Sequence, residues 1–151
     1  MRTFLIAVAL FMLAGCSSSP GGLFSRAYDA WGTGTFPVSE PGQAALYIVR
    51  EPAHPDSPPI NITVGRQPLV GLTAPNWVRL DLPPKLYDLR AYGPQTNSEL
   101  IITVAPGQTR FLLAQPTPTG GAELLELSQE QGRKLVRKGE RLWTPEIDSD
   151  Y

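Results

Sequence analysis

From about residue 44 onward, short apolar runs alternate with breaks that contain proline and glycine. In residues 60–64 and 77–82, apolar and polar positions alternate with a period of two, which is typical of a strand with one buried face. Other runs, rich in apolar or strand-forming residues, also predict strands: 44–50, 69–72, 86–92, 99–104, 109–114 and 122–127. About seven or eight short strands separated by turn signals predict a mainly β fold, a small antiparallel β-sandwich.

Two of these runs, 99–104 and 109–114, flank a Pro106–Gly107 pair that is placed for a β-turn. We therefore expect them to form a hairpin. Their near-continuous apolar character further predicts that both are central strands of a sheet.

Charged residues interrupt two other predicted strands on the side opposite their apolar residues. Arg79 and Asp81 are outward residues of one strand, and Asp88 and Arg90 are outward residues of the next. Opposite charges on neighbouring strands predict cross-strand ion pairs.

One short helix follows the last predicted strand. Ser128 and Gln131 have the spacing of a capping box, in which each side chain satisfies the backbone N–H of the other residue. The helix is expected from Gln129 to about Lys138, with Gly139 ending it. The predicted domain therefore spans residues 44–140, and residues 141–151 are expected to be a tail.

The predicted helix and the short segment just after it carry the chain's one cluster of basic residues. The members are Arg133, Lys134, Arg137, Lys138 and Arg141. A spacing of four places three arginines on one side of a helix, with the lysines beside them. One interpretation is a solvated face whose cations suit a helix C-terminus; the other is a contact patch for anionic lipid headgroups, lipopolysaccharide phosphates or an acidic partner.

The first 43 residues have a different composition. Residues 1–15 contain Arg2 and then an apolar run of about ten residues, which is shorter than the roughly 20 needed to cross a bilayer as a helix. This length is typical of a signal peptide, with cleavage expected between Gly15 and Cys16. Residues 16–43 begin with Ser, Pro and Gly, the composition of a flexible tether.

Within this tether, residues 23–31 have apolar positions at helical spacing. Phe24, Tyr28 and Trp31 fall on one face of the expected short helix. Two interpretations remain open for it: a segment that packs on the domain, or an interfacial helix whose aromatic rings lie at headgroup level.

The Leu-Ala-Gly-Cys sequence that ends at Cys16 resembles the lipobox of bacterial lipoproteins. The resemblance implies an S-diacylglycerol and an N-acyl chain on Cys16, and several acyl chains together anchor a protein stably in a membrane. It also implies an outer-membrane address, at the periplasmic face, because Ser17 rather than Asp follows the cysteine.

Composition narrows the class of function. The chain has 151 residues, 13 basic and 14 acidic, with a formal net charge of −1, so it lacks the basic excess expected of a nucleic-acid-binding protein. With a single cysteine, assigned to the lipid, the domain is expected to have no disulfide and no structural zinc. His54, the sole histidine, lies in a proline-rich loop, and no phosphate-binding loop is present. We therefore expect no enzymatic activity, no metal and no dissociable cofactor.

Three stretches carry a second resemblance: LYIVR at 46–50, LDLPPKLYDL at 80–89 and ITVAPGQT at 102–109. They are similar to a family of bacterial lipoprotein domains of unknown function, the family numbered 2846. They are also similar to PEGA-type domains. The resemblance covers roughly residues 44–138 and implies a transthyretin-like or carboxypeptidase-regulatory-like sandwich without catalytic residues. Pro84 stands where that family usually has glycine, and Gly65–Arg66 replaces an expected Asp-Gly turn.

Together these patterns predict a non-enzymatic, lipid-anchored module of the cell envelope. The leading hypothesis is a structural or adaptor role with an envelope protein as partner. The alternative is a module that binds a small ligand or a glycan, in the sandwich or along a strand edge.

Overall fold

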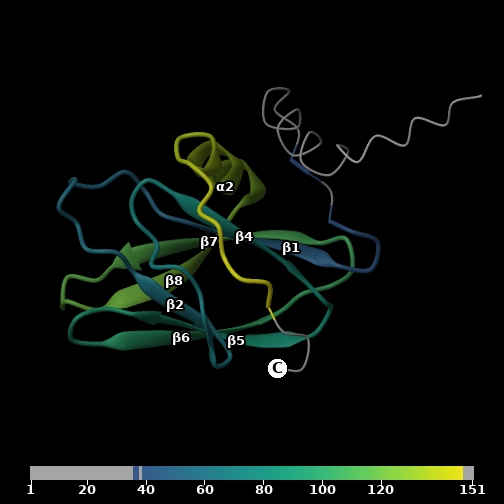
Figure 1. Ribbon diagram of the computed structural model, residues 1–151, viewed down its shortest axis with the longest axis horizontal. Helices are drawn as coiled ribbons and strands as arrows, with labels where there is room; N and C mark the ends of the chain where they lie inside the picture. Colours follow the sequence, from purple (N-terminus) through teal and green to yellow (C-terminus); the bar gives the residue numbers. More distant parts are fainter. Residues whose placement is uncertain (1–35, 38, 148–151) are drawn as a thin grey trace, which may run out of the picture. The chain divides into compact units, whose positions relative to one another are not determined.

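The computed structural model describes residues 36–37 and 39–147. Its strands and helix are β1 (Ala44–Val49), β2 (Asn61–Val64), β3 (Gln67–Pro68), β4 (Trp77–Leu82), β5 (Leu86–Tyr92), β6 (Asn97–Thr103), β7 (Thr109–Pro116), β8 (Ala122–Leu127) and α2 (Gln129–Val136). The strands form one sheet of order β4-β1-β7-β8 and a second of order β3-β2-β5-β6. The two sheets lie face to face, and α2 lies on the outer side of the first (Figure 1). The predicted β-sandwich with a short C-terminal helix is confirmed.

One strand pairing within the described residues differs from the antiparallel expectation. β1 and β7 are parallel, with Ala45 opposite Thr109 and Val49 opposite Leu113. Between these two strands the chain forms β2 and β3 in the second sheet, β4 in the first sheet, and then β5 and β6 in the second sheet. The other pairings between the strands are antiparallel.

The main core lies between the sheets, where every second residue of the strands points inward. In β1, Leu46 and Ile48 belong to this core, yet all six residues of the strand are buried. The reason is a second layer on the outer face, where the ring of Tyr47 stacks on Phe111 at 4.9 Å and lies 5.8 Å from Trp77. β1 is thus covered on both faces, which explains its uninterrupted run of non-polar residues.

The predicted hairpin around Pro106–Gly107 is wrong. The turn forms, because Gln108 N donates to Ala105 O at 3.0 Å, but β6 and β7 belong to different sheets. β7 is a central strand as predicted, whereas β6 is an edge strand and leaves Ile101 59% exposed. Proline and glycine specify the change of direction, but not whether the flanking strands pair.

The strand predicted at 69–72 is also displaced. The structure places β3 at Gln67–Pro68, paired with Thr63 and Val64 of β2. Within 69–72 the ladder is reduced to one isolated bridge between Leu72 and Ile60. The apolar character of this segment instead comes from Leu69 and Leu72, which are buried in the core.

The charges on β4 and β5 pair mainly along each strand. Arg79 bonds Asp81 at 2.6 Å, and Arg90 bonds Asp88 at 2.9 Å, so both pairs join residues two apart on one face. Only the longer 3.4 Å contact of Arg90 with Glu99 crosses between strands. Arg79 is not solvated as expected but 9% exposed, because its guanidinium lies over the Tyr47 ring, 5.6 Å from the centroid.

Residues 141–147, expected to belong to a tail, pack on the sandwich. Leu142 N donates to Trp77 O at 2.8 Å, and Arg141 forms a parallel bridge with Trp77. Further on, Gln67 Nε2 donates to Glu146 O at 2.6 Å, and Ile147 is buried in the core. The domain therefore extends past residue 140, because apolar side chains near the end complete the core.

Within the described ranges, no helix has both the length and the apolar character needed to cross a bilayer.

Candidate functional site

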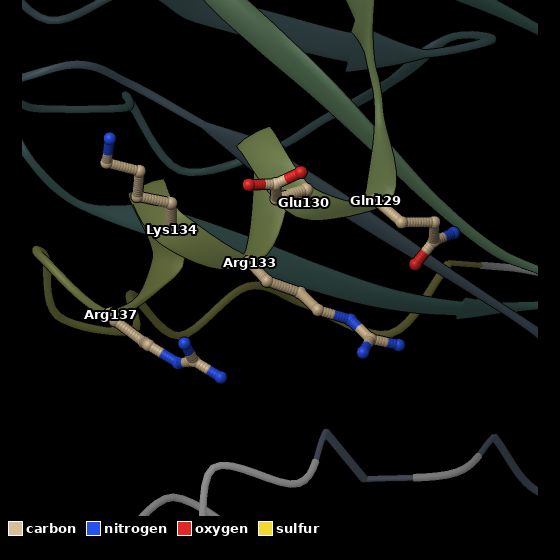
Figure 2. A pocket seen from close by; sticks show the side chains of 5 residues that line it. All are labelled: Gln129, Glu130, Arg133, Lys134 and Arg137. Carbon is tan, nitrogen blue, oxygen red and sulfur yellow. The ribbon is translucent and has the colours of Figure 1, made fainter.

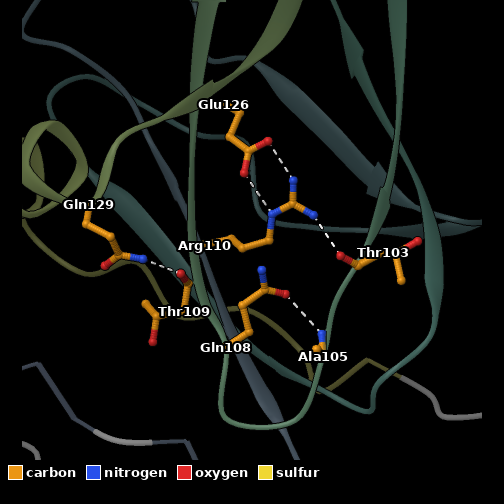
Figure 3. Close-up of polar contacts among 7 residues, drawn as sticks. All are labelled: Thr103, Ala105, Gln108, Thr109, Arg110, Glu126 and Gln129. Atoms are coloured by element: carbon orange, nitrogen blue, oxygen red, sulfur yellow. Dashed lines mark hydrogen bonds and ion pairs between the residues drawn. The ribbon is translucent and has the colours of Figure 1, made fainter.

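The helix α2 begins with the predicted capping box. Gln131 N donates to Ser128 Oγ at 3.3 Å, and Ser128 N donates to Gln131 Oε1 at 3.2 Å. These reciprocal bonds satisfy two backbone N–H groups at the start of the helix, so the sequence signal is confirmed. Gln129 adds a tertiary contact, since its Nε2 donates to Thr109 O at the start of β7 (Figure 3).

Packing then fixes the helix against the first sheet. Gly132 lies directly on Phe111, so closely that a methyl group at this position would overlap the ring. Val136 is buried one turn later, and Trp77 Nε1 donates to Gly139 O at 3.2 Å just after the helix. The helix ends at Val136, two residues earlier than predicted, with Arg137 as its C-cap.

The opposite face of α2 is solvent-exposed and mainly basic. Gln129, Glu130, Arg133, Lys134 and Arg137 line a shallow depression of about 470 Å³ on it (Figure 2). Three cations and one carboxylate give this depression a formal charge of +2. The side chains of Arg133 and Arg137 extend to the same side of the helix, as their spacing of four requires. We call these two arginines and Lys134 the basic face of α2.

The remaining two members of the predicted cluster lie outside the helix. Lys138 is exposed just beyond the C-cap. Arg141 is not on the same helical side as Arg137, because the helix has already ended and Arg141 forms the bridge with Trp77. It lines a different depression, of about 380 Å³, with Arg79 and Trp143. The predicted five-residue patch therefore reduces to Arg133 and Lys134 on the helix and Arg137 at its C-cap, with Lys138 nearby.

The predicted lipidation and interfacial residues lie outside the described residues. These are Gly15, Cys16, Phe24, Tyr28 and Trp31. Their roles stay predictions.

The basic face is suited to electrostatic binding of an anionic surface.

In the part of the chain that the structure describes, no group of three or more His, Cys, Asp or Glu residues is arranged to hold a metal. His54 lies in an exposed loop, where its Nδ1 is 3.3 Å from Asp56 Oδ2.

A further cationic residue was missed by the sequence interpretation. Arg50, the residue after β1, is only 3% exposed. Its Nη1 donates to Pro58 O at 2.7 Å and to Leu72 O at 2.9 Å. Among the described residues, no carboxylate forms an ion pair with it. The only sequence feature that could have indicated Arg50 is its position at the end of an otherwise apolar strand, next to a proline-rich loop. The burial of its side chain depends on distant residues and has no local sequence pattern.

Neither the family models nor the curated proteins compared with this chain include a match.

Proposed function

We propose that this protein is a non-enzymatic lipoprotein of the bacterial envelope that acts as an adaptor. Acyl chains on Cys16 hold it at the periplasmic face of the outer membrane, and the basic face of α2 contacts an acidic surface of a partner envelope protein. The anchor part of this proposal rests on the lipobox resemblance and the short apolar leader. The domain resemblance to the lipoprotein family described above is compatible with the sandwich and remains part of the proposal.

The observation that carries the adaptor role is the basic face itself. The chain as a whole has a small negative formal charge, yet three cations gather on one exposed side of one helix. Contacts of Gly132 and Gln129 with β7 hold that helix in place. A concentrated field on a rigid element favours fast, salt-dependent association with an oppositely charged partner.

Metabolic labelling with a fatty acid tests the anchor. We expect the wild type to incorporate label and Cys16→Ser to incorporate none, since the thiol is the proposed attachment point. A labelled Cys16→Ser protein, or an unlabelled wild type, would refute the anchor.

Crosslinking in intact envelopes tests the adaptor role. We expect the double substitution Arg133→Glu and Arg137→Glu to reduce adduct formation at least about tenfold, because it changes the formal charge of the face by four units. Arg66→Glu, which reverses one charge at an exposed turn away from α2, is the control and should leave the adducts unchanged. Equal adducts from all three proteins, at low and high salt, would refute this use of the helix.

Liposome binding separates a protein partner from a lipid one. The chain from residue 16 onward, with Cys16→Ser, is mixed with anionic and with neutral vesicles. Retention by anionic vesicles that the double charge reversal abolishes would move the proposal from an adaptor to a lipid-contacting module.

A further inference from the structure

Arg50 lies at the end of the sandwich where several strand-connecting loops meet. It lines a pocket of about 390 Å³ that is also bordered by Asn61, Tyr92, Pro116 and Ala122. These residues come from the ends of β1, β2, β5, β7 and β8, five strands distributed over both sheets. The pocket is therefore built by the fold as a whole.

The walls of this pocket are stiff and mostly apolar. Four of its lining residues are prolines, whose fixed φ angles restrict the loops. Gly93 and Gly121 bring two loops so close together that a methyl group at Gly93 would meet the Gly121 backbone. A pocket of this size with preformed walls is within the range of small-molecule sites.

The guanidinium of Arg50 is held in place by hydrogen bonds from one of its three nitrogens. Nη1 uses its two protons on the carbonyls of Pro58 and Leu72. Nε has no hydrogen-bond partner, but it is buried away from solvent, so a ligand in the pocket does not contact it. Nη2 is not among the buried unpartnered atoms, and no hydrogen bond joins it to the described residues. Nη2 is therefore the nitrogen that can offer N–H groups to an anion, and a charged donor bonds strongly to a carboxylate.

The charge of Arg50 is also uncompensated within the pocket. None of the lining residues is Asp or Glu, and Arg50 is the only charged residue among them. Burial lowers the pKa of the guanidinium from its ordinary value, but an arginine in a protein stays protonated. A buried cation without a counter-ion is costly, so an anion that enters and pairs with it is favoured.

We propose that this pocket binds a small organic carboxylate, which accepts a hydrogen bond from Nη2 of Arg50 and whose apolar body lies against the prolines. The single cation and the apolar walls favour a carboxylate over inorganic phosphate, because the pocket offers no second cation for a dianion. This site is separate from the basic face of α2.

Nuclear magnetic resonance on the ¹⁵N-labelled chain from residue 16 onward, with Cys16→Ser, tests the proposal. The probe is sodium benzoate, with benzamide, inorganic phosphate and sodium chloride at matched ionic strength as comparisons. We expect benzoate to shift the Arg50 Nε–H signal saturably, with a Kd on the order of millimolar for so small a ligand. Benzamide and chloride should leave the signal in place, and phosphate should bind at least about tenfold more weakly.

Variants at Ser57, on the rim of the pocket, locate the ligand without disturbing the bonds of Arg50. Ser57→Asp should weaken benzoate binding about tenfold, because the new carboxylate repels the ligand and competes for the guanidinium. Ser57→Asn is the neutral control and should bind within about twofold of the wild type.

Three results would overturn the inference: no saturable shift with benzoate, phosphate binding as tight as benzoate, or unchanged binding by Ser57→Asp. The double charge reversal at Arg133 and Arg137 should leave benzoate binding unaltered. The carboxylate site and the adaptor role therefore fail independently.

Discussion

Replacing Gly132 with alanine is expected to destabilise the protein, although the same change stabilises most helices. In an exposed helix interior, Gly→Ala gains about 1 kcal/mol from backbone propensity. Here the added methyl group would overlap Cβ and Cγ of Phe111. The side chain of Phe111 cannot move aside cheaply, because it is 1% exposed and stacks on Tyr47.

The expected magnitude follows from these opposing terms. Overpacking a dense interior costs roughly 1–3 kcal/mol and more where the neighbour is rigid. Subtraction of the propensity gain of about 1 kcal/mol leaves a cost of about 0–2 kcal/mol. Because Phe111 is rigid, we expect Gly132→Ala to lower the free energy of unfolding by about 2 kcal/mol, the upper end of this range. The helix must shift outward to relieve the overlap, which would also displace the basic face of α2.

Urea denaturation followed by circular dichroism measures this change. Glu130→Ala, at an exposed position on the same helix, is the control and should stay within about 0.5 kcal/mol of the wild type. Phe111→Ala removes Cγ and the ring, which include the closest contact, and leaves only Cβ. In that background Gly132→Ala should cost less than in the wild type, a coupling that a double-mutant cycle detects.

This reasoning would be refuted if Gly132→Ala alone raised the free energy of unfolding by about 1 kcal/mol, as helix propensity alone predicts. Equal destabilisation with and without Phe111→Ala would also contradict it, because the cost would then arise elsewhere.

Three further predictions concern the core, an ion pair and pH. Ile147→Ala should lower the free energy of unfolding, measured by urea denaturation, by about 2 kcal/mol, because Ile147 is a core residue that is only 8% exposed. No change in stability would contradict the assignment of Ile147 to the core. Glu126→Gln should cost about 0.5–1 kcal/mol by weakening the two-bond pair with Arg110 (Figure 3), and the loss should shrink at 1 M salt. Burial raises the pKa of Tyr47 and Tyr87 above the ordinary value of 10.0. As the pH rises, the unfolded chain therefore loses these protons before the folded chain does, and the free energy of unfolding should fall above about pH 10. Tyr47→Phe should make this fall smaller in urea titrations at several pH values.

The sequence by itself determined the features that depend on a few neighbouring residues. Period-two alternation marked strands such as β2 and β4, proline and glycine marked the turns, and the spacing of Ser128 and Gln131 marked the start of α2. These signals are local, because backbone conformation and capping bonds involve residues within one turn or one strand. The exposed cations of α2 were predictable for the same reason, up to the point where the helix ended.

Only the tertiary structure decided which segments meet. It made β6 an edge strand and paired β1 with β7 in parallel, although their sequences carry no mark of either. It also packed the guanidinium of Arg79 against the Tyr47 ring and brought loops from both sheets together around Arg50. Burial and ion pairing depend on groups brought together from distant positions, so the carboxylate pocket could be found only after the sandwich had assembled it.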